Sequence, residues 1–223
     1  MAYPGGKNGA GVFQILINLI PPHQTYIETH LGGGAIMKNK RPARKSIGID
    51  IDPDVVAMWQ SEAQGRQDLI VIKGDAVVFL QEYDFQGSEF VYCDPPYMME
   101  TRKSGQLYSF EYNTEQHIDL LQTIASLPCH VMISGYWSEL YYSHLKGWSV
   151  RNFEVQTRGG SPATEYVWFN YSEPVALHDY TFLGSNFRER ERIKRKKQRW
   201  VNRLVKMPLL ERRALLNAIK EVF

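Results

Sequence analysis

Short runs of apolar residues alternate, along residues 1–170, with segments whose apolar positions recur at helical spacing. Such runs predict buried strands, and the alternation favours a mainly parallel sheet covered by helices. The clearest helical segments are residues 54–63 and 114–126, and Asn113 and Gln116 are spaced as a capping box before the second. We therefore expect an α/β fold, with strands at residues 26–28, 46–50, 69–72, 89–93, 130–134, 150–155 and 166–170.

The segment after residue 170 has a different pattern. Leu183-Gly184-Ser185 has the composition of a linker, and Asn186 with Glu189 resembles another helix start. Pro208 interrupts the helical periodicity, which then resumes to residue 222. We predict a domain of residues 1–183 and a helical hairpin of residues 184–223, whose single apolar stripe contains Ile193, Trp200, Val201, Leu204, Val205, Leu210, Ala214, Leu215 and Ile219.

Charge is distributed unevenly between these two parts, although the formal net charge of the chain is only +2. Residues 186–223 carry 13 Lys and Arg against 4 Asp and Glu, a net charge of +9, whereas the other residues carry 13 against 20, a net charge of −7. A basic segment on an acidic body favours a polyanionic partner, and we expect nucleic acid. The alternative is a helix face that is simply solvated.

The two cysteines, Cys93 and Cys129, lie in apolar, strand-like segments, where we expect reduced core residues and neither a disulfide nor a metal pair. The apolar stretch of residues 12–20 is too short to span a bilayer, and it lacks the layout of a signal peptide. We therefore expect a cytoplasmic protein with no membrane partner and no metal.

Acidic residues stand at or just after the ends of four predicted strands, at Glu28, Asp50, Asp75 and Asp94. In a parallel sheet these ends meet at one edge, where ligands bind. Gly32-Gly33-Gly34 follows the first strand and would let a ligand approach the backbone, but it lacks the Gly-x-Gly-x-x-Gly spacing of a nicotinamide site. Asp50 suits a ribose diol and Asp75 an adenine amino group, although either would also serve as a helix cap or turn residue.

Asp94-Pro95-Pro96-Tyr97, directly after the strand of residues 89–93, is the most informative stretch of the sequence. The prolines restrict the backbone and lack N–H donors, so the carbonyls of Asp94 and Pro95 can accept hydrogen bonds from a substrate amino group. Tyr97 can stack on the face of a flat ring. Taken alone, the stretch also fits a strand that ends in a proline turn.

Together these motifs stand in the linear order of the Dam-like DNA adenine methyltransferases, a family that residues 1–170 resemble. Tyr3-Pro4-Gly5-Gly6-Lys7 is similar to the family's N-terminal cofactor motif, and residues 28–34 are similar to its glycine loop after the first strand. Further matches are Asp50 to the acidic ribose ligand, Gly74-Asp75 to the next cofactor contact and residues 94–97 to the catalytic signature.

The resemblance implies a class I S-adenosylmethionine-dependent methyltransferase fold, a Rossmann-like, seven-stranded mixed sheet, here with a basic C-terminal helical extension. It also implies direct methyl transfer from S-adenosylmethionine to the exocyclic amino nitrogen of an adenine flipped out of DNA. The implied catalytic residues are Asp94, Pro95, Pro96 and Tyr97. The implied cofactor-binding residues are Tyr3, Lys7, Glu28, Leu31, Gly32, Gly34, Asp50, Asp75 and Asp94.

Two departures from the family concern the cofactor position and DNA recognition. Thr29-His30 stands where the family has Pro-Phe, and only 18 residues separate Asp75 from Asp94, where the family carries a recognition domain. We therefore expect a short or relaxed target site, read by loops at residues 98–113 and 158–161 and by the basic helices. The candidate DNA-binding residues are Arg102, Lys103, Tyr108, Arg158, Arg192, Arg195, Lys196 and Arg199.

Three alternatives stay open on the sequence. The enzyme could methylate another amino group, in RNA or in cytosine; a catalytically silent protein could keep the fold and bind DNA; and a regulator could bind a nucleotide in place of S-adenosylmethionine. We expect the partner to be duplex or single-stranded DNA, and the protein to be a monomer or homodimer in a bacterial, prophage or phage setting. A cognate restriction endonuclease would fit that setting.

Overall fold

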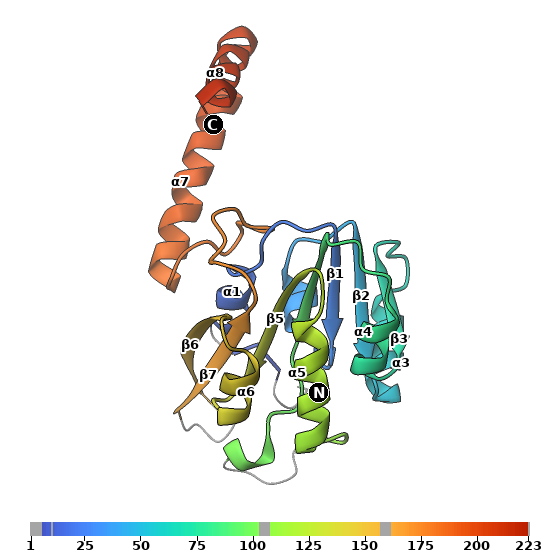
Figure 1. The fold of residues 1–223 in the computed structure, drawn as a ribbon. Helices are drawn as coiled ribbons and strands as arrows, with labels where there is room; N and C mark the ends of the chain where they lie inside the picture. Colours follow the sequence, from blue (N-terminus) through green and yellow to red (C-terminus); the bar gives the residue numbers. More distant parts are fainter. Residues whose placement is uncertain (1–5, 10, 103–107, 157–161, 223) are drawn as a thin grey trace. The chain divides into compact units, whose positions relative to one another are not determined.

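The computed structural model of the protein describes residues 6–9, 11–102, 108–156 and 162–222. The chain forms two compact units, Met1–Asp179 and Tyr180–Phe223. The first unit contains a seven-stranded sheet with the strand order β3-β2-β1-β4-β5-β7-β6 (Figure 1). The prediction of a seven-stranded mixed sheet in an α/β fold is confirmed.

Across the sheet, the five strands β3, β2, β1, β4 and β5 are parallel to one another. The strand β7 pairs antiparallel with both β5 and β6. The last strand starts four residues before the predicted residue 166, because Pro162 already pairs with Gln156 of β6. The strands are β1 (Thr25–Thr29), β2 (Lys45–Asp50), β3 (Leu69–Lys73), β4 (Glu89–Cys93), β5 (His130–Gly135), β6 (Ser149–Gln156) and β7 (Pro162–Phe169).

Short helices connect the strands and cover both faces of the sheet. Figure 1 shows α4, α5 and α6 in front of the sheet and α1 and α2 behind it. The predicted capping box opens α5, where the side chains of Asn113 and Gln116 each accept a 2.9 Å hydrogen bond from the other residue's backbone N–H. The helices of this unit are α1 (Val12–Ile17), α2 (Ala35–Asn39), α3 (Pro53–Glu62), α4 (Ala76–Glu82), the 3-10 turn η1 (Met99–Thr101), α5 (Thr114–Ala125) and α6 (Glu139–His144).

Alternate residues of the central strands pack against α4, α5 and α6, as the period of two in a strand requires. Each buried aliphatic side chain of this kind stabilises a fold by about 1.5–3 kcal/mol. The core includes Cys93 and Cys129, which are buried free thiols as the sequence predicts. Other members are Ile27, Ile47, Leu80, Val91, Leu120, Ile124 and Val131.

The second unit contains two helices, α7 (Phe187–Lys206) and α8 (Leu209–Val222). Asn186 caps α7 by accepting a 3.0 Å hydrogen bond from the Glu189 N–H, and the helical periodicity breaks at Pro208 as expected. Neither helix contains a buried side chain. Within the described part of the chain, no helix has the length and apolarity needed to cross a membrane.

The glycine loop after β1 is fixed by close packing against α3. Gly34 precedes α2 with a φ of 54°, and a Cβ atom added there would lie 2.0 Å from a ring carbon of Trp59. The Trp59 indole is 1% exposed, and its N–H donates a 2.8 Å hydrogen bond to the Gly32 carbonyl. The loop therefore has no room for a side chain at Gly34.

Gly34→Ala should destabilise the protein more than Gly65→Ala does, as measured by urea unfolding. Gly65 also has a positive φ, 81°, but a Cβ there would meet nothing within 4 Å, so its substitution tests the backbone conformation alone. We expect a loss of about 1–2 kcal/mol for Gly65→Ala. Gly34→Ala should cost about 1–3 kcal/mol more, because it also forces the Trp59 ring to move. Equal losses would contradict this account of the loop.

Candidate active site

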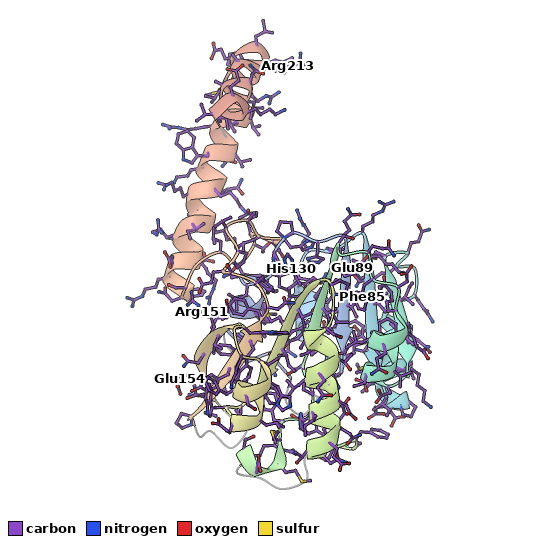
Figure 2. All side chains as sticks on the ribbon, viewed as in Figure 1. Phe85, Glu89, His130, Arg151, Glu154 and Arg213 are labelled. Atoms are coloured by element: carbon purple, nitrogen blue, oxygen red, sulfur yellow. The ribbon has the colours of Figure 1, made fainter. Side chains whose placement is uncertain are left out.

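Four acidic residues lie along one edge of the sheet, where the parallel strands β3, β2, β1 and β4 end. Glu28 pairs across the sheet with Tyr92 and Gly48, and Asp50 is the last residue of β2. Asp94 directly follows β4, and Asp75 lies two residues after the end of β3. The sequence prediction that these strand ends meet is confirmed. Glu89 and His130, which Figure 2 labels, begin β4 and β5 at the opposite edge.

The N-terminal Lys7 is joined to the Asp94-Pro95-Pro96-Tyr97 stretch. The Lys7 ammonium donates a 2.7 Å hydrogen bond to Asp94 Oδ1 and a 2.6 Å hydrogen bond to the Tyr97 hydroxyl. The Lys7 side chain is only 4% exposed, so this is a buried ion pair. Two motifs that are 87 residues apart in the sequence thus form one cluster.

The charges of this cluster shift one another's pKa values. Burial raises the pKa of Asp94, and the Lys7 ammonium opposes that shift. Burial acting alone would lower the pKa of Lys7, but the negative charges of Asp94 and Glu165 together raise it above its usual value. Lys7 therefore stays positively charged, and its loss would leave Asp94 as an uncompensated buried charge.

Asp50 and Asp75 both order the backbone at the rim of the sheet. Asp50 accepts a 2.8 Å hydrogen bond from the Gly32 N–H and a 2.9 Å hydrogen bond from the Asp52 N–H, so it ties the glycine loop to the end of β2. Asp75 caps α4 through Oδ1, which accepts from the N–H groups of Val77 and Val78 at 2.8 and 3.0 Å. The capping alternative for Asp75 is thus confirmed, and both carboxylates also line a cavity at this edge.

Glu28 and His30 lie on either side of Thr29 and make different contacts. Glu28 Oε2 accepts hydrogen bonds from the Tyr26 hydroxyl at 2.9 Å and from the Met37 N–H at 3.0 Å, and burial raises the pKa of Glu28 to about 8. His30 has a φ of 59°, which is unusual for a residue with a side chain. Its Nε2 is hydrogen-bonded to the Tyr112 hydroxyl at 2.8 Å.

Two adjoining cavities lie at this edge, and His30, Asp94 and Tyr108 line both of them. One has a volume of about 30 Å³ and reaches Lys7, Glu28 and the glycine loop with Leu31, Gly32 and Gly34. The other has a volume of about 120 Å³ and is lined by Asp50, Asp75 and Pro96 and by the aromatic residues Phe110 and Tyr112. Asp94 therefore stands where the predicted cofactor residues and the predicted catalytic stretch meet.

The predicted DNA-binding residues have very different surroundings. The Arg102 side chain is 4% exposed and donates a 3.0 Å hydrogen bond to Glu111, so a phosphate would reach it only after that pair opened. Tyr108 faces the two cavities. Lys103 and Arg158 lie outside the described residues, as does Tyr3, which was predicted to bind the cofactor.

The predicted basic residues of the C-terminal unit are all exposed on α7. Arg188, Arg192, Arg195 and Arg199 follow one another at helical spacings and line one face of the helix. Lys196 is exposed on the same helix, whereas Ile193, Trp200 and Leu204 fall on another face. The arrangement presents a row of positive charges to solvent, as the sequence predicts.

Glu165 of β7 is a site residue that the sequence analysis missed. Its carboxylate lies 3.8 Å from the Lys7 ammonium, and its side chain is 12% exposed. The predicted strand began four residues too late, at Tyr166, which left Glu165 outside it. The period of two would have identified it, because Glu165 shares its side of β7 with the buried Val167 and Phe169.

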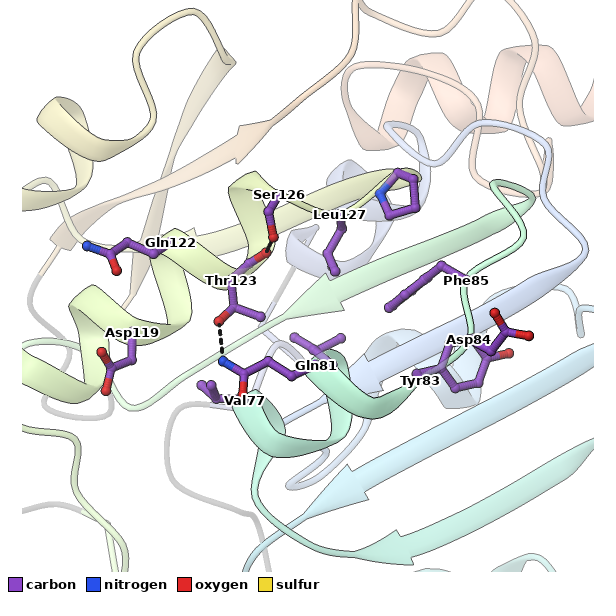
Figure 3. Close-up of a pocket in the computed structure, with 12 residues that line it drawn as sticks. Val77, Gln81, Tyr83, Asp84, Phe85, Asp119, Gln122, Thr123, Ser126 and Leu127 are labelled. Atoms are coloured by element: carbon purple, nitrogen blue, oxygen red, sulfur yellow. Dashed lines mark hydrogen bonds between the residues drawn. The ribbon is translucent and has the colours of Figure 1, made fainter.

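A larger hollow of about 810 Å³ lies between α4 and α5 (Figure 3). Its walls include Val77, Gln81, Asp119 and Thr123, and Gln81 donates a 3.3 Å hydrogen bond to Thr123 across it. None of the four acidic rim residues lines this hollow. Among the described residues, no group of three or more His, Cys, Asp or Glu is placed to hold a metal ion. The chemistry-bearing side chains therefore gather at the sheet edge and not in the larger hollow.

No family model and no curated protein matches the sequence. Solved structures do match the fold. The N-methyltransferase NodS from Bradyrhizobium japonicum WM9 aligns with a TM-score of 0.52 and 9% identity, over 71% of this chain and 93% of that one. A SAM-dependent methyltransferase from Methanosarcina mazei aligns with a TM-score of 0.51 and 9% identity, over 70% and 95%. The first unit thus has the class I S-adenosylmethionine-dependent methyltransferase fold.

His30 predicts a specific pH dependence of stability. Burial lowers the pKa of His30 from 6.5 to about 4, so between these values the unfolded chain takes up a proton that the native protein does not. The free energy of unfolding should therefore decrease as the pH falls below 6.5. Between pH 6 and 5, wild type should lose about 1 kcal/mol more than His30→Gln, which has no imidazole to protonate. Denaturant titrations at both pH values measure the difference, and parallel curves would contradict the prediction.

Proposed function

We propose that the protein transfers a methyl group from S-adenosylmethionine to the exocyclic amino nitrogen of adenine in DNA. The position of Asp94 carries this proposal. Its carboxylate follows a buried strand and borders both cavities of the rim, and Pro95 is the next residue of the chain. The Asp94 carboxylate and the Pro95 carbonyl would offer two oxygen acceptors to an amino group with two hydrogens, and the fold supports the choice of cofactor.

The residues of the rim fit S-adenosylmethionine chemically. The glycine loop lets a ligand approach the backbone at Gly32 and Gly34, Asp50 can accept hydrogen bonds from a ribose diol, and Asp75 borders the same cavity. The cavities of about 30 and 120 Å³ are smaller than the roughly 300 Å³ of typical ligand sites, so binding must displace lining side chains such as Tyr108 and Tyr112.

Asp94 and Pro95 would act by orienting the target amine and stabilising its developing charge. An adenine amino nitrogen is a poor nucleophile, because its lone pair is delocalised into the ring. Hydrogen bonds from its hydrogens to Asp94 and to the Pro95 carbonyl favour pyramidal geometry and in-line attack. When bound, S-adenosylmethionine supplies the methyl group: the carbon–sulfur electron pair stays on sulfur, the nitrogen lone pair forms the new bond, and the amine proton passes to water.

Tyr97 and the basic helix would bind the DNA. Tyr97 is only 6% exposed and lines neither cavity of the rim, so its ring would have to become accessible before it could stack on a flipped base. The row of arginines on α7 would neutralise phosphates without reading sequence. This division of roles agrees with the short or relaxed target site expected from the sequence.

Asp94→Asn should slow methylation of DNA by about 100-fold, because it removes the negative charge that faces the reacting nitrogen. Incorporation of labelled methyl groups into DNA measures the rate, and calorimetry with S-adenosylmethionine checks that the cofactor site is intact. The matched control is Asp84→Asn, at an exposed position after α4, which should methylate as wild type does. An unchanged rate in Asp94→Asn would exclude the proposed mechanism.

Arg192→Gln combined with Arg195→Gln should reduce the salt dependence of DNA binding. If both arginines neutralise phosphates, the slope of log affinity against log salt becomes shallower by about 1.8, at roughly 0.9 for each contact. Fluorescence anisotropy at several salt concentrations measures the slope. The control pair Arg41→Gln and Arg44→Gln, exposed before β2 at the opposite edge of the sheet, should leave it unchanged. An unaltered slope in the α7 variant would mean that this helix does not bind DNA.

A further inference from the structure

One oxygen of the Glu165 carboxylate accepts no hydrogen bond within the described part of the structure. Glu165 Oε2 is buried and has no hydrogen-bond partner among the described residues. The Lys7 ammonium lies 3.8 Å from this oxygen, which is longer than a hydrogen bond. A buried acceptor without a partner is costly, so its persistence calls for a physical reason.

Lys7 meanwhile is bonded to one oxygen of the carboxylate that the proposed reaction needs. Its ammonium is 2.7 Å from Asp94 Oδ1, the carboxylate that would receive the target amine. The Lys7 side chain is 4% exposed, so if the ammonium left Asp94 it would require another anion and not water. Glu165 is the anion in place, and a shift of roughly 1 Å would bring the pair from 3.8 Å to charge-assisted hydrogen-bond length.

We propose that Glu165 is a positioning residue that takes over the Lys7 ammonium when the target amine binds Asp94. This inference rests on the function proposed above. The exchange keeps one cation and two carboxylates together throughout, so the buried ammonium always has a carboxylate beside it. The cluster retains one net negative charge, which favours the positive charge that develops on the attacking nitrogen.

A double-mutant cycle with Lys7→Met tests the exchange in single-turnover methylation of DNA. Glu165→Gln keeps the shape of the side chain but cannot balance the ammonium, so methyl transfer should be about 10- to 100-fold slower while the affinity for S-adenosylmethionine is unchanged. In the Lys7→Met background the same substitution should cause no further loss, because Glu165 acts through Lys7. Glu165→Asp, which keeps the charge, should recover most of the rate.

The control is Glu154→Gln. Glu154, which is labelled in Figure 2, lies on the adjacent strand β6. Glu154 is exposed and accepts a 2.7 Å hydrogen bond from the Thr164 hydroxyl, and its substitution should leave the rate unchanged. A wild-type rate in Glu165→Gln, or equal losses in both backgrounds, would overturn the inference. So would a loss of thermal stability or cofactor affinity in Glu165→Gln, since the carboxylate would then serve the fold. A wild type that methylates no DNA would instead refute the proposed function itself.

Discussion

The buried ion pair between Lys7 and Asp94 is the interaction on which the arrangement of the rim depends. It joins the N-terminal segment to the end of β4, and the same ammonium binds the Tyr97 hydroxyl and lies near Glu165 of β7. Removing one member of such a pair typically costs about 3–5 kcal/mol, because the other is left charged and buried. A cluster of this kind is expensive for a fold to maintain, which argues that the carboxylate is kept for chemistry.

The backbone at the rim carries a second constraint. Gly32, Gly34 and His30 have φ values of 43°, 54° and 59°, and a non-glycine residue in this region stores about 1–3 kcal/mol of strain. Trp59 and Asp50 hold the loop in place through hydrogen bonds to the backbone of Gly32. The loop is therefore held close to the sheet edge. Because its glycines have no side chains, a ligand could lie along their backbone.

The sequence predicted the parts of the fold that depend on local pattern. Apolar runs located the seven strands, and the Asn113 capping box located the start of α5. Contacts between distant segments were not accessible, so the pairing of Lys7 with Asp94 and the role of Trp59 came only from the structure. Glu165 was missed because β7 extends beyond its apolar run. The apolar stripe of α7 and α8 shows another limit of prediction from sequence. Helical periodicity indicates that a helix has an apolar face, but not which part of the structure covers that face.

The most direct test of the central claim is to identify the methylated nucleoside. Duplex DNA is incubated with the full-length protein and labelled S-adenosylmethionine, digested to nucleosides and separated by chromatography with mass detection. The proposed transfer to adenine, with its amino group bound by Asp94 and the Pro95 carbonyl, predicts label in N6-methyladenine. Label in methylated cytosine, or no label in DNA while RNA is methylated, would contradict the assignment of adenine in DNA as the target.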